Sequence, residues 1–317
     1  MVWLSAALLA AAPVSLAIGP TRLDLSALLS GDELMRTILF EIRLPRLLLA
    51  LLIGGSLGLA GAALQGLFRN PLAEPGILGV SASAALGAVI ALYHAAHGGG
   101  LPVPVAAMAG AFAATGLLLF LSRHDVSLLS LILAGVGINA LAGAATALAL
   151  NLSPNPFALA DMVHWLMGSL ADRDLNDVAL AAPFILAGCA LILGSGPALS
   201  ALTLGDEVAR SLGVPLGRLR LRLVAGTALA VGAGVAVAGG IGFIGLIAPH
   251  LLRRASGHDP GALLLPSALL GALLLLLADS LARLLPGGQE LKLGVVTALI
   301  GAPVFLHMVY RLGRERR

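Results

Sequence analysis

The sequence predicts an all-α polytopic membrane protein of about ten transmembrane helices in two related halves. Three observations predict this fold class: 59% of the 317 residues are apolar, only 11% are charged, and 40 are glycine. An average soluble domain is about 25% charged. A soluble globule is excluded because 19 basic and 16 acidic side chains are too few to cover its surface. Disorder is excluded because so apolar a chain would not stay solvated.

Runs of apolar residues, separated by charged residues, proline, glycine and asparagine, define the predicted crossings. A helix needs about 20 such residues to span the hydrocarbon core. The eighth run is too short to cross alone unless the seventh ends early, near the glycines of 239–242. The ten segments are 2–19, 44–68, 76–93, 101–122, 128–152, 178–199, 223–243, 244–255, 261–283 and 293–311.

A further short apolar piece, 157–169, carries Asp161, His164 and Trp165. It is predicted to be an interfacial helix, because tryptophan and charged groups suit the headgroup layer. The first segment, 2–19, is expected to be retained, since no basic residues precede its apolar run as they would in a signal peptide.

Loop charges set the predicted orientation. An even number of crossings places both termini on one side of the membrane. If that side is the cytoplasm, twelve Lys and Arg residues fall inside and seven outside. The positive-inside rule therefore favours cytoplasmic termini.

Two glycine-rich stretches resemble each other. Residues 54–71, GGSLGLAGAALQGLFRNP, align with 232–249, GAGVAVAGGIGFIGLIAP, at a constant offset of 178. Just beyond them, the tripeptide EPG at 74–76 corresponds to DPG at 259–261 after an insertion of seven residues.

This similarity predicts repeat-related halves of about 1–175 and 176–317, within a single transmembrane domain that spans 1–317. Duplicated halves are common in transporters, whose pathway lies at the repeat interface. Small-residue contacts between helices would produce a similar pattern. The two explanations are compatible.

The sequence offers little for an enzyme or an ion-coupled carrier. It contains no HExxH and no Cys/His metal spacing, and its single cysteine, Cys189, cannot form an internal disulfide. His250 is interpreted as a structural residue. Ion coupling calls for buried ionisable residues, and Asp279 is the main candidate. A secondary carrier and a membrane enzyme remain as alternatives.

An ATP-driven protein of this sequence would need a separate motor subunit. The only lysine, Lys292, does not lie in a phosphate-binding glycine loop. A motor must bind a cytoplasmic surface, and the most polar inside stretch is 202–222. Its Gly205-Asp206-Glu207 start suits a helix N-terminus, and Pro215 prevents continuation. The residues alone leave open whether 202–222 couples to a motor or is an ordinary amphipathic loop.

Several motifs together resemble one family. They are IRLPR at 42–46, QGLFRNPLAEPGILG at 65–79, LGDEVARSLG at 204–213, GFIGLIAPH at 242–250, LGVVT at 293–297 and GAPVF at 301–305. This pattern resembles the FecCD family, the membrane subunits of ABC importers for iron–siderophore complexes, haem and cobalamin. The chain departs from the family at Lys292, where proline is frequent.

The resemblance implies a homodimeric permease in a bacterial inner membrane. Its partners would be membrane lipid, a periplasmic substrate-binding protein and two cytoplasmic ATPase subunits, with no nucleic acid. Those ATPases would bind ATP and Mg, so this chain would hold no cofactor and no metal and would have no catalytic residues. The implied cargo is a ferric siderophore or haem, with cobalamin as the alternative.

The resemblance also implies roles for particular residues. Arg43, Arg46 and Arg283 would dock the binding protein, since guanidinium groups pair well with carboxylates; anchoring at headgroups is the alternative. The coupling element would comprise Gly205, Asp206, Glu207, Ala209, Arg210 and Gly213. The pathway would be lined by the last segment and by the fifth, with Gly135, Gly137 and Asn139. For Asn139 an interhelical contact is preferred.

Overall fold

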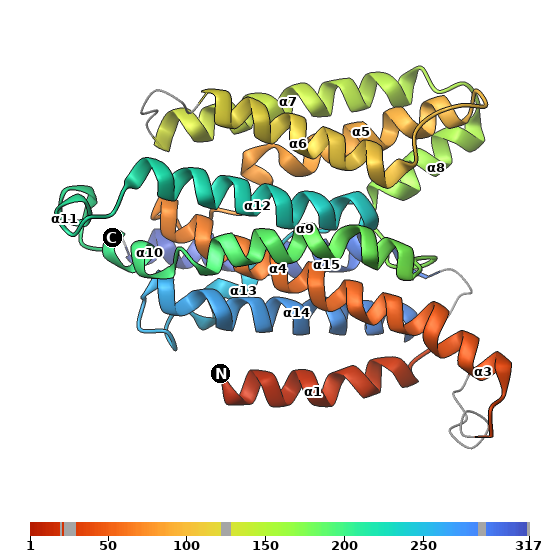
Figure 1. Ribbon diagram of the computed structural model, residues 1–317, viewed down its shortest axis with the longest axis horizontal. Helices are drawn as coiled ribbons and strands as arrows, with labels where there is room; N and C mark the ends of the chain where they lie inside the picture. Colours follow the sequence, from red (N-terminus) through yellow and green to blue (C-terminus); the bar gives the residue numbers. More distant parts are fainter. Residues whose placement is uncertain (20, 22–29, 122–127, 285–289, 316–317) are drawn as a thin grey trace.

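The computed structural model describes residues 1–19, 21, 30–121, 128–284 and 290–315, which form helices and no strands (Figure 1). The elements, in chain order, are α1 (Val2–Ala17), α3 (Glu33–Thr37), η1 (Ile38–Arg43), α4 (Leu44–Phe68), η2 (Pro75–Leu78), α5 (Val80–Ala95), α6 (Val103–Leu121), α7 (Leu128–Asn151), α8 (Pro156–Leu166), α9 (Leu175–Leu193), α10 (Gly196–Leu202), α11 (Asp206–Ser211), α12 (Leu216–Ala238), α13 (Ile244–Leu252), α14 (Pro260–Leu284) and α15 (Leu293–Glu315).

Each of the ten predicted segments contains a helix, but not every one is long enough to cross a bilayer. Within the described residues, seven helices are long and apolar enough, and they correspond to α4, α6, α7, α9, α12, α14 and α15. The other three are the 16-residue α1 and α5 and the nine-residue α13. The all-helical membrane fold is therefore confirmed, and the count of ten crossings stays a prediction.

The seventh predicted segment does end early. Helix α12 stops at Ala238 because Gly239 adopts a positive φ of 72°. The chain then turns through residues 239–243, with Phe243 also left-handed at φ 66°, before the short helix α13 begins.

The segment 157–169, predicted to be an interfacial helix, contains most of helix α8. The Asn155 side chain caps the start of this helix.

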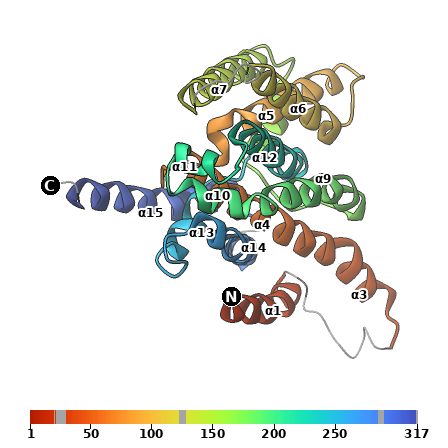
Figure 2. The same cartoon turned by 60° about the vertical axis from the view of Figure 1, so that its left-hand side comes forward.

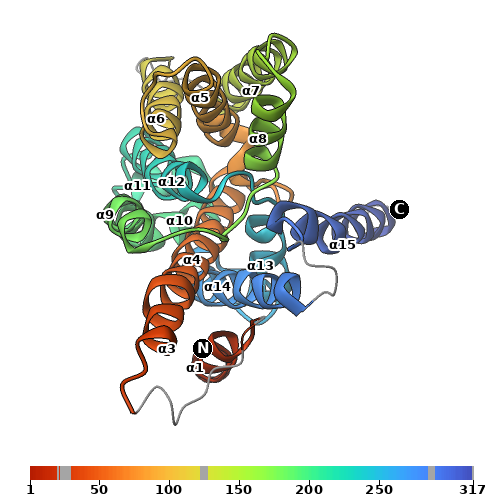
Figure 3. The same cartoon turned by 90° about the vertical axis from the view of Figure 1, so that its right-hand side faces the viewer.

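Helix α4 lies at the centre of the bundle. Seen end on, it is flanked by α9, α12, α13 and α14, while α5 to α8 form a second group (Figure 3). Helix α1 packs against α14, and α15 projects away from the bundle (Figures 2 and 3). Its central position explains why α4, together with α12, is more buried than the other long helices.

Small residues let these helices approach closely. A Cβ atom on Gly58 would lie 2.1 Å from the carbonyl oxygen of Ser267, and one on Gly61 would lie 1.8 Å from that of Gly245. Backbone contact of this kind is typical of membrane helix pairs. The glycines of the proposed repeat therefore do serve as helix contacts.

The two repeat-like stretches have different backbones. Residues 54–68 belong to the unbroken helix α4, whereas their counterparts contain the non-helical turn of 239–243. The division into halves stays a prediction. The start of α1 and the end of α15 both lie toward the end of the molecule that carries α11 (Figure 1). Four arginines of the charge count, Arg22, Arg123, Arg316 and Arg317, and residue 122 of the fourth segment lie outside the described residues.

Candidate functional site

Three arginines, Arg43, Arg46 and Arg283, gather where α4 begins and α14 ends. Together with Asp279 and Glu290, the acidic partners of Arg46 and Arg283, we call them the arginine cluster. The Arg46 Nε lies 2.7 Å from Asp279 Oδ1, and Asp279 is only 1% exposed. The same guanidinium forks onto Glu290, with Nη1–Oε1 at 3.1 Å and Nη2–Oε2 at 2.8 Å. Arg283 Nη2 lies 3.0 Å from the second Asp279 oxygen.

The remaining donors of the cluster hold the C-terminal end of α1. Arg283 donates to the carbonyls of Ser15 and Ile18 at 3.0 and 2.7 Å, and Arg43 donates to those of Leu16 and Thr21. The last carbonyls of a helix have no partner within it and carry partial negative charge. Arginine side chains therefore stabilise this helix end and tie α1 to α4 and α14.

The structure thus brings the three predicted docking residues together but turns their guanidinium groups inward. Arg43 and Arg46 are both buried. Their donors are already bound to carboxylates or to backbone carbonyls of the same chain. Glu290 is the more exposed of the two acidic partners, with 37% of its side chain accessible. Docking of the binding protein at these arginines stays a prediction, and it requires an existing contact to be exchanged.

The predicted coupling element is a short helix, α11, between two glycines of positive φ, Gly205 and Gly213. Ala209 faces the protein and is fully buried. Asp206 pairs with Arg69 at 2.5 Å and with Arg220 at 3.5 Å. One side of α11 is therefore fixed to the ends of α4 and α12.

The other side of α11 is exposed. It presents Glu207 and Arg210 together with apolar Leu204, Val208 and Leu212, of which Leu204 and Leu212 are more than 60% exposed. Charged residues around exposed apolar ones are typical of surfaces that bind another protein. This arrangement favours a docking surface over an ordinary loop, and the motor role stays a prediction.

The predicted pathway residues fall on two sides of α7. Gly135 is buried against η2, since a Cβ atom there would lie 2.3 Å from the carbonyl oxygen of Ile77. Gly137 and Asn139 lie on the exposed side. Helices α7 and α15 are both mostly exposed in the single chain, and α15 projects away from the group of helices that contains α7 (Figure 3). Gly135 thus serves packing in this structure, while Gly137 and Asn139 are accessible.

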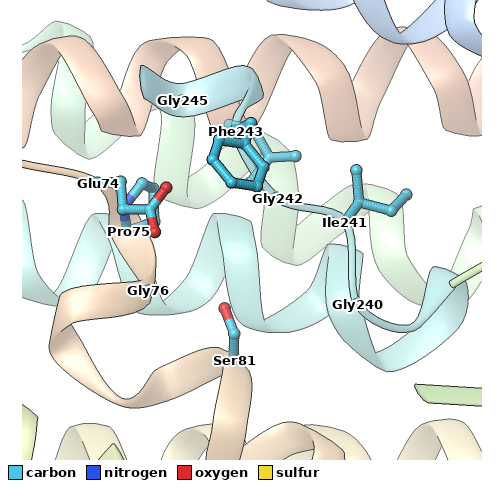
Figure 4. Close-up of a pocket in the computed structure, with 10 residues that line it drawn as sticks. Glu74, Pro75, Gly76, Ser81, Gly240, Ile241, Gly242, Phe243 and Gly245 are labelled. Atoms are coloured by element: carbon cyan, nitrogen blue, oxygen red, sulfur yellow. The ribbon is translucent and has the colours of Figure 1, made fainter. Parts of the chain in front are cut away.

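A cavity of about 220 Å³ lies between η2 and the turn of 239–243. Figure 4 shows the Glu74 carboxylate beside the Phe243 ring and the Ser81 hydroxyl directed toward the same space. Burial raises the pKa of Glu74. The sequence placed Glu74 only within a motif. Its correspondence with Asp259 in the EPG and DPG tripeptides was the one signal that it is special.

The comparisons with known proteins agree with this architecture. Residues 7–311 match the FecCD transport family. The chain is 42% identical over 298 residues to the hemin transport system permease protein HmuU of Yersinia pestis, which covers 90% of this chain and 87% of HmuU. It is 43% identical over 292 residues to the vitamin B12 import system permease protein BtuC of Vibrio cholerae, again 90% and 87%.

A solved structure is similar over almost the whole length. It is a metal-chelate type ABC transporter in an inward-facing conformation, with a TM-score of 0.87, 34% sequence identity and 97% of each chain covered. The arrangement of the helices is therefore that of a known kind of membrane protein. The chain is a member of the FecCD transport family and a membrane-embedded permease subunit of an ABC importer.

Proposed function

We propose that this permease carries an iron complex, either a ferric siderophore or haem, from a periplasmic binding protein into the cytoplasm. The observation that supports this cargo class is the similarity to both a hemin permease and a metal-chelate type transporter. Cobalamin is the second candidate, since vitamin B12 permeases are equally similar. Two copies of the chain would form the pathway between them, in a bacterial inner membrane with both termini cytoplasmic.

The proposed mechanism is alternating access driven by separate ATPase subunits, which would bind the ATP and Mg. Each ATPase would grip the exposed side of α11. Motion of α11 would reach α4 through the Asp206–Arg69 ion pair, and residues 69–79 would carry it to α7 through the close contact between Ile77 and Gly135. Few charged groups would face this pathway, so its walls would bind the cargo weakly and a bulky complex could leave.

At the opposite end, we propose that Glu290 occupies the position that a carboxylate of the binding protein takes on docking. Its fork on Arg46 is the geometry in which an arginine binds an incoming carboxylate. Because Asp279 stays beside Arg46 when Glu290 leaves, the guanidinium keeps one anionic partner during the exchange. Docking would then exchange one carboxylate for another at Arg46.

Glu290→Gln is therefore expected to strengthen docking of the acidic partner by about three- to tenfold at low salt. The change removes the competing charge and leaves the Arg46–Asp279 pair in place. The measurement is the affinity of the binding protein for the permease in nanodiscs at low and high ionic strength, and the gain should shrink at high salt. Glu41→Gln, the same charge change at an exposed residue of η1 outside the cluster, is the control. Unchanged or weaker binding of the Glu290 variant would refute the exchange.

The cargo is tested by a binding screen of the partner binding protein against haem, ferric siderophores and cobalamin. The proposal predicts tight binding of haem or of a ferric siderophore. Binding of cobalamin alone would assign the second candidate instead.

A further inference from the structure

The cavity beside η2 contains an acidic residue that neither docking nor coupling uses. Its lining comes from α4, η2, α5 and the turn before α13, and Glu74 is the only charged or titratable side chain among these lining residues. Glu74 sits directly before η2 but makes no side-chain hydrogen bond to the start of that helix. The carboxylate therefore faces the cavity without a basic partner.

The corresponding residue of the second half behaves differently. Asp259 accepts hydrogen bonds from Ser200 Oγ at 2.5 Å and from the backbone N–H of Gly261 at 3.0 Å. Asp259 thus serves as a cap for the start of α14. Of the two corresponding carboxylates, Asp259 therefore caps a helix, whereas Glu74 makes no such bond.

The ligand that this cavity suits is a proton. A metal ion needs several oxygen ligands, and the turn does not supply them. The carbonyl oxygen of Gly242 accepts from Ile244 N–H, and that of Gly240 lies against Gly168 and Gly294. A single carboxylate among apolar residues and one hydroxyl is costly when ionised, so burial favours its neutral form wherever bulk water is excluded.

We propose that Glu74 is a proton-binding site whose carboxyl is neutral while the cavity is closed and ionises when water enters. The turn is a suitable element to open, since it contains two left-handed residues, Gly239 and Phe243. The Phe243 ring packs closely against Gly301, so the turn is in contact with α15. Opening and closing of the cavity would then release and bind one proton.

The sign of the pH dependence follows from this cycle. Partial burial raises the pKa of Glu74 in this structure, so a closed state that buries the carboxyl further would bind more protons than a hydrated one. Closure is fully favoured at pH below the ordinary glutamate value and is lost progressively as pH rises toward the raised value. A single proton changes the closed-to-open ratio by at most about tenfold per pH unit.

Labelling of a cysteine in the cavity tests this directly in membrane vesicles. The chain would carry Ser81→Cys and Cys189→Ala, and the rate of modification by a charged methanethiosulfonate would be measured from pH 5 to pH 8. Comparison with the same protein carrying Glu74→Gln removes the effect of the thiol's own ionisation. We expect labelling to rise with pH several-fold more steeply when Glu74 is present, and Glu41→Gln to leave that excess unchanged.

Two results would overturn the proposal. One is the same pH profile with and without Glu74→Gln. The other is labelling that follows the sodium concentration at fixed pH, which would make the ligand a metal cation. The experiment uses neither ATPase nor cargo, so its outcome is independent of the transport function proposed above.

Discussion

Replacing Asp279 by asparagine is expected to lower the free energy of unfolding by about 3–5 kcal/mol, the loss typical of a broken buried ion pair. The Asp279 carboxylate lies between the guanidinium groups of Arg46 and Arg283. Asparagine has nearly the same shape but carries no charge. Two buried cations would then lose their shared anion, and α1, α4 and α14 would lose their common tie.

The measurement is reversible unfolding in mixed micelles. Ser280→Ala is a control for the loss of a neutral partner, because its buried hydroxyl donates to the carbonyl of Leu276 in its own helix and accepts only a long contact, 3.5 Å, from Arg283; its expected cost is about 1 kcal/mol. The double variant Arg46→Met with Asp279→Leu should regain part of the loss, since it removes both charges of a pair. A loss for Asp279→Asn no larger than that for Ser280→Ala would contradict the structural role of the cluster.

Reversing the charges on the exposed side of α11 is expected to uncouple transport from ATP hydrolysis. Glu207→Arg with Arg210→Glu keeps the net charge and alters two exposed side chains. Wrong charges facing an interface cost several kcal/mol, so assembly with the ATPase should weaken by at least about tenfold. Cargo-stimulated ATPase activity of the reconstituted complex reports the loss.

A closely matched control exists at the other end of the molecule. Glu33→Arg with Arg36→Glu reverses an exposed acidic and basic pair with the same spacing of three residues, on α3. This variant should retain coupling. If the α11 variant stimulates ATPase activity as well as the control does, α11 is not the docking element.

Much of the fold could be predicted from local sequence. The segment 128–152 corresponds to α7 and 261–283 to α14, within one or two residues, because an apolar helix in lipid must be continuous until charged or breaking residues end it. The shape of 202–222 was also predictable, since Gly205, Gly213 and Pro215 act on their own neighbours.

What could not be predicted depends on partners far along the chain. Arg46 and Asp279 are separated by 233 residues, and the residues around each of them contain no signal that the two form an ion pair. The arginines therefore looked free for an external partner, whereas the fold gives them internal ones. Gly135 was predicted to line the pathway, and the residues around it give no sign of its close contact with Ile77 of η2.

Uptake by proteoliposomes tests the central claim most directly. They would contain this permease with its ATPase subunits, and receive the binding protein loaded with haem, a ferric siderophore or cobalamin. We predict accumulation of haem or the ferric siderophore that requires ATP and the ATPase subunits. Accumulation driven by a proton or sodium gradient without those subunits would contradict an ATP-driven importer.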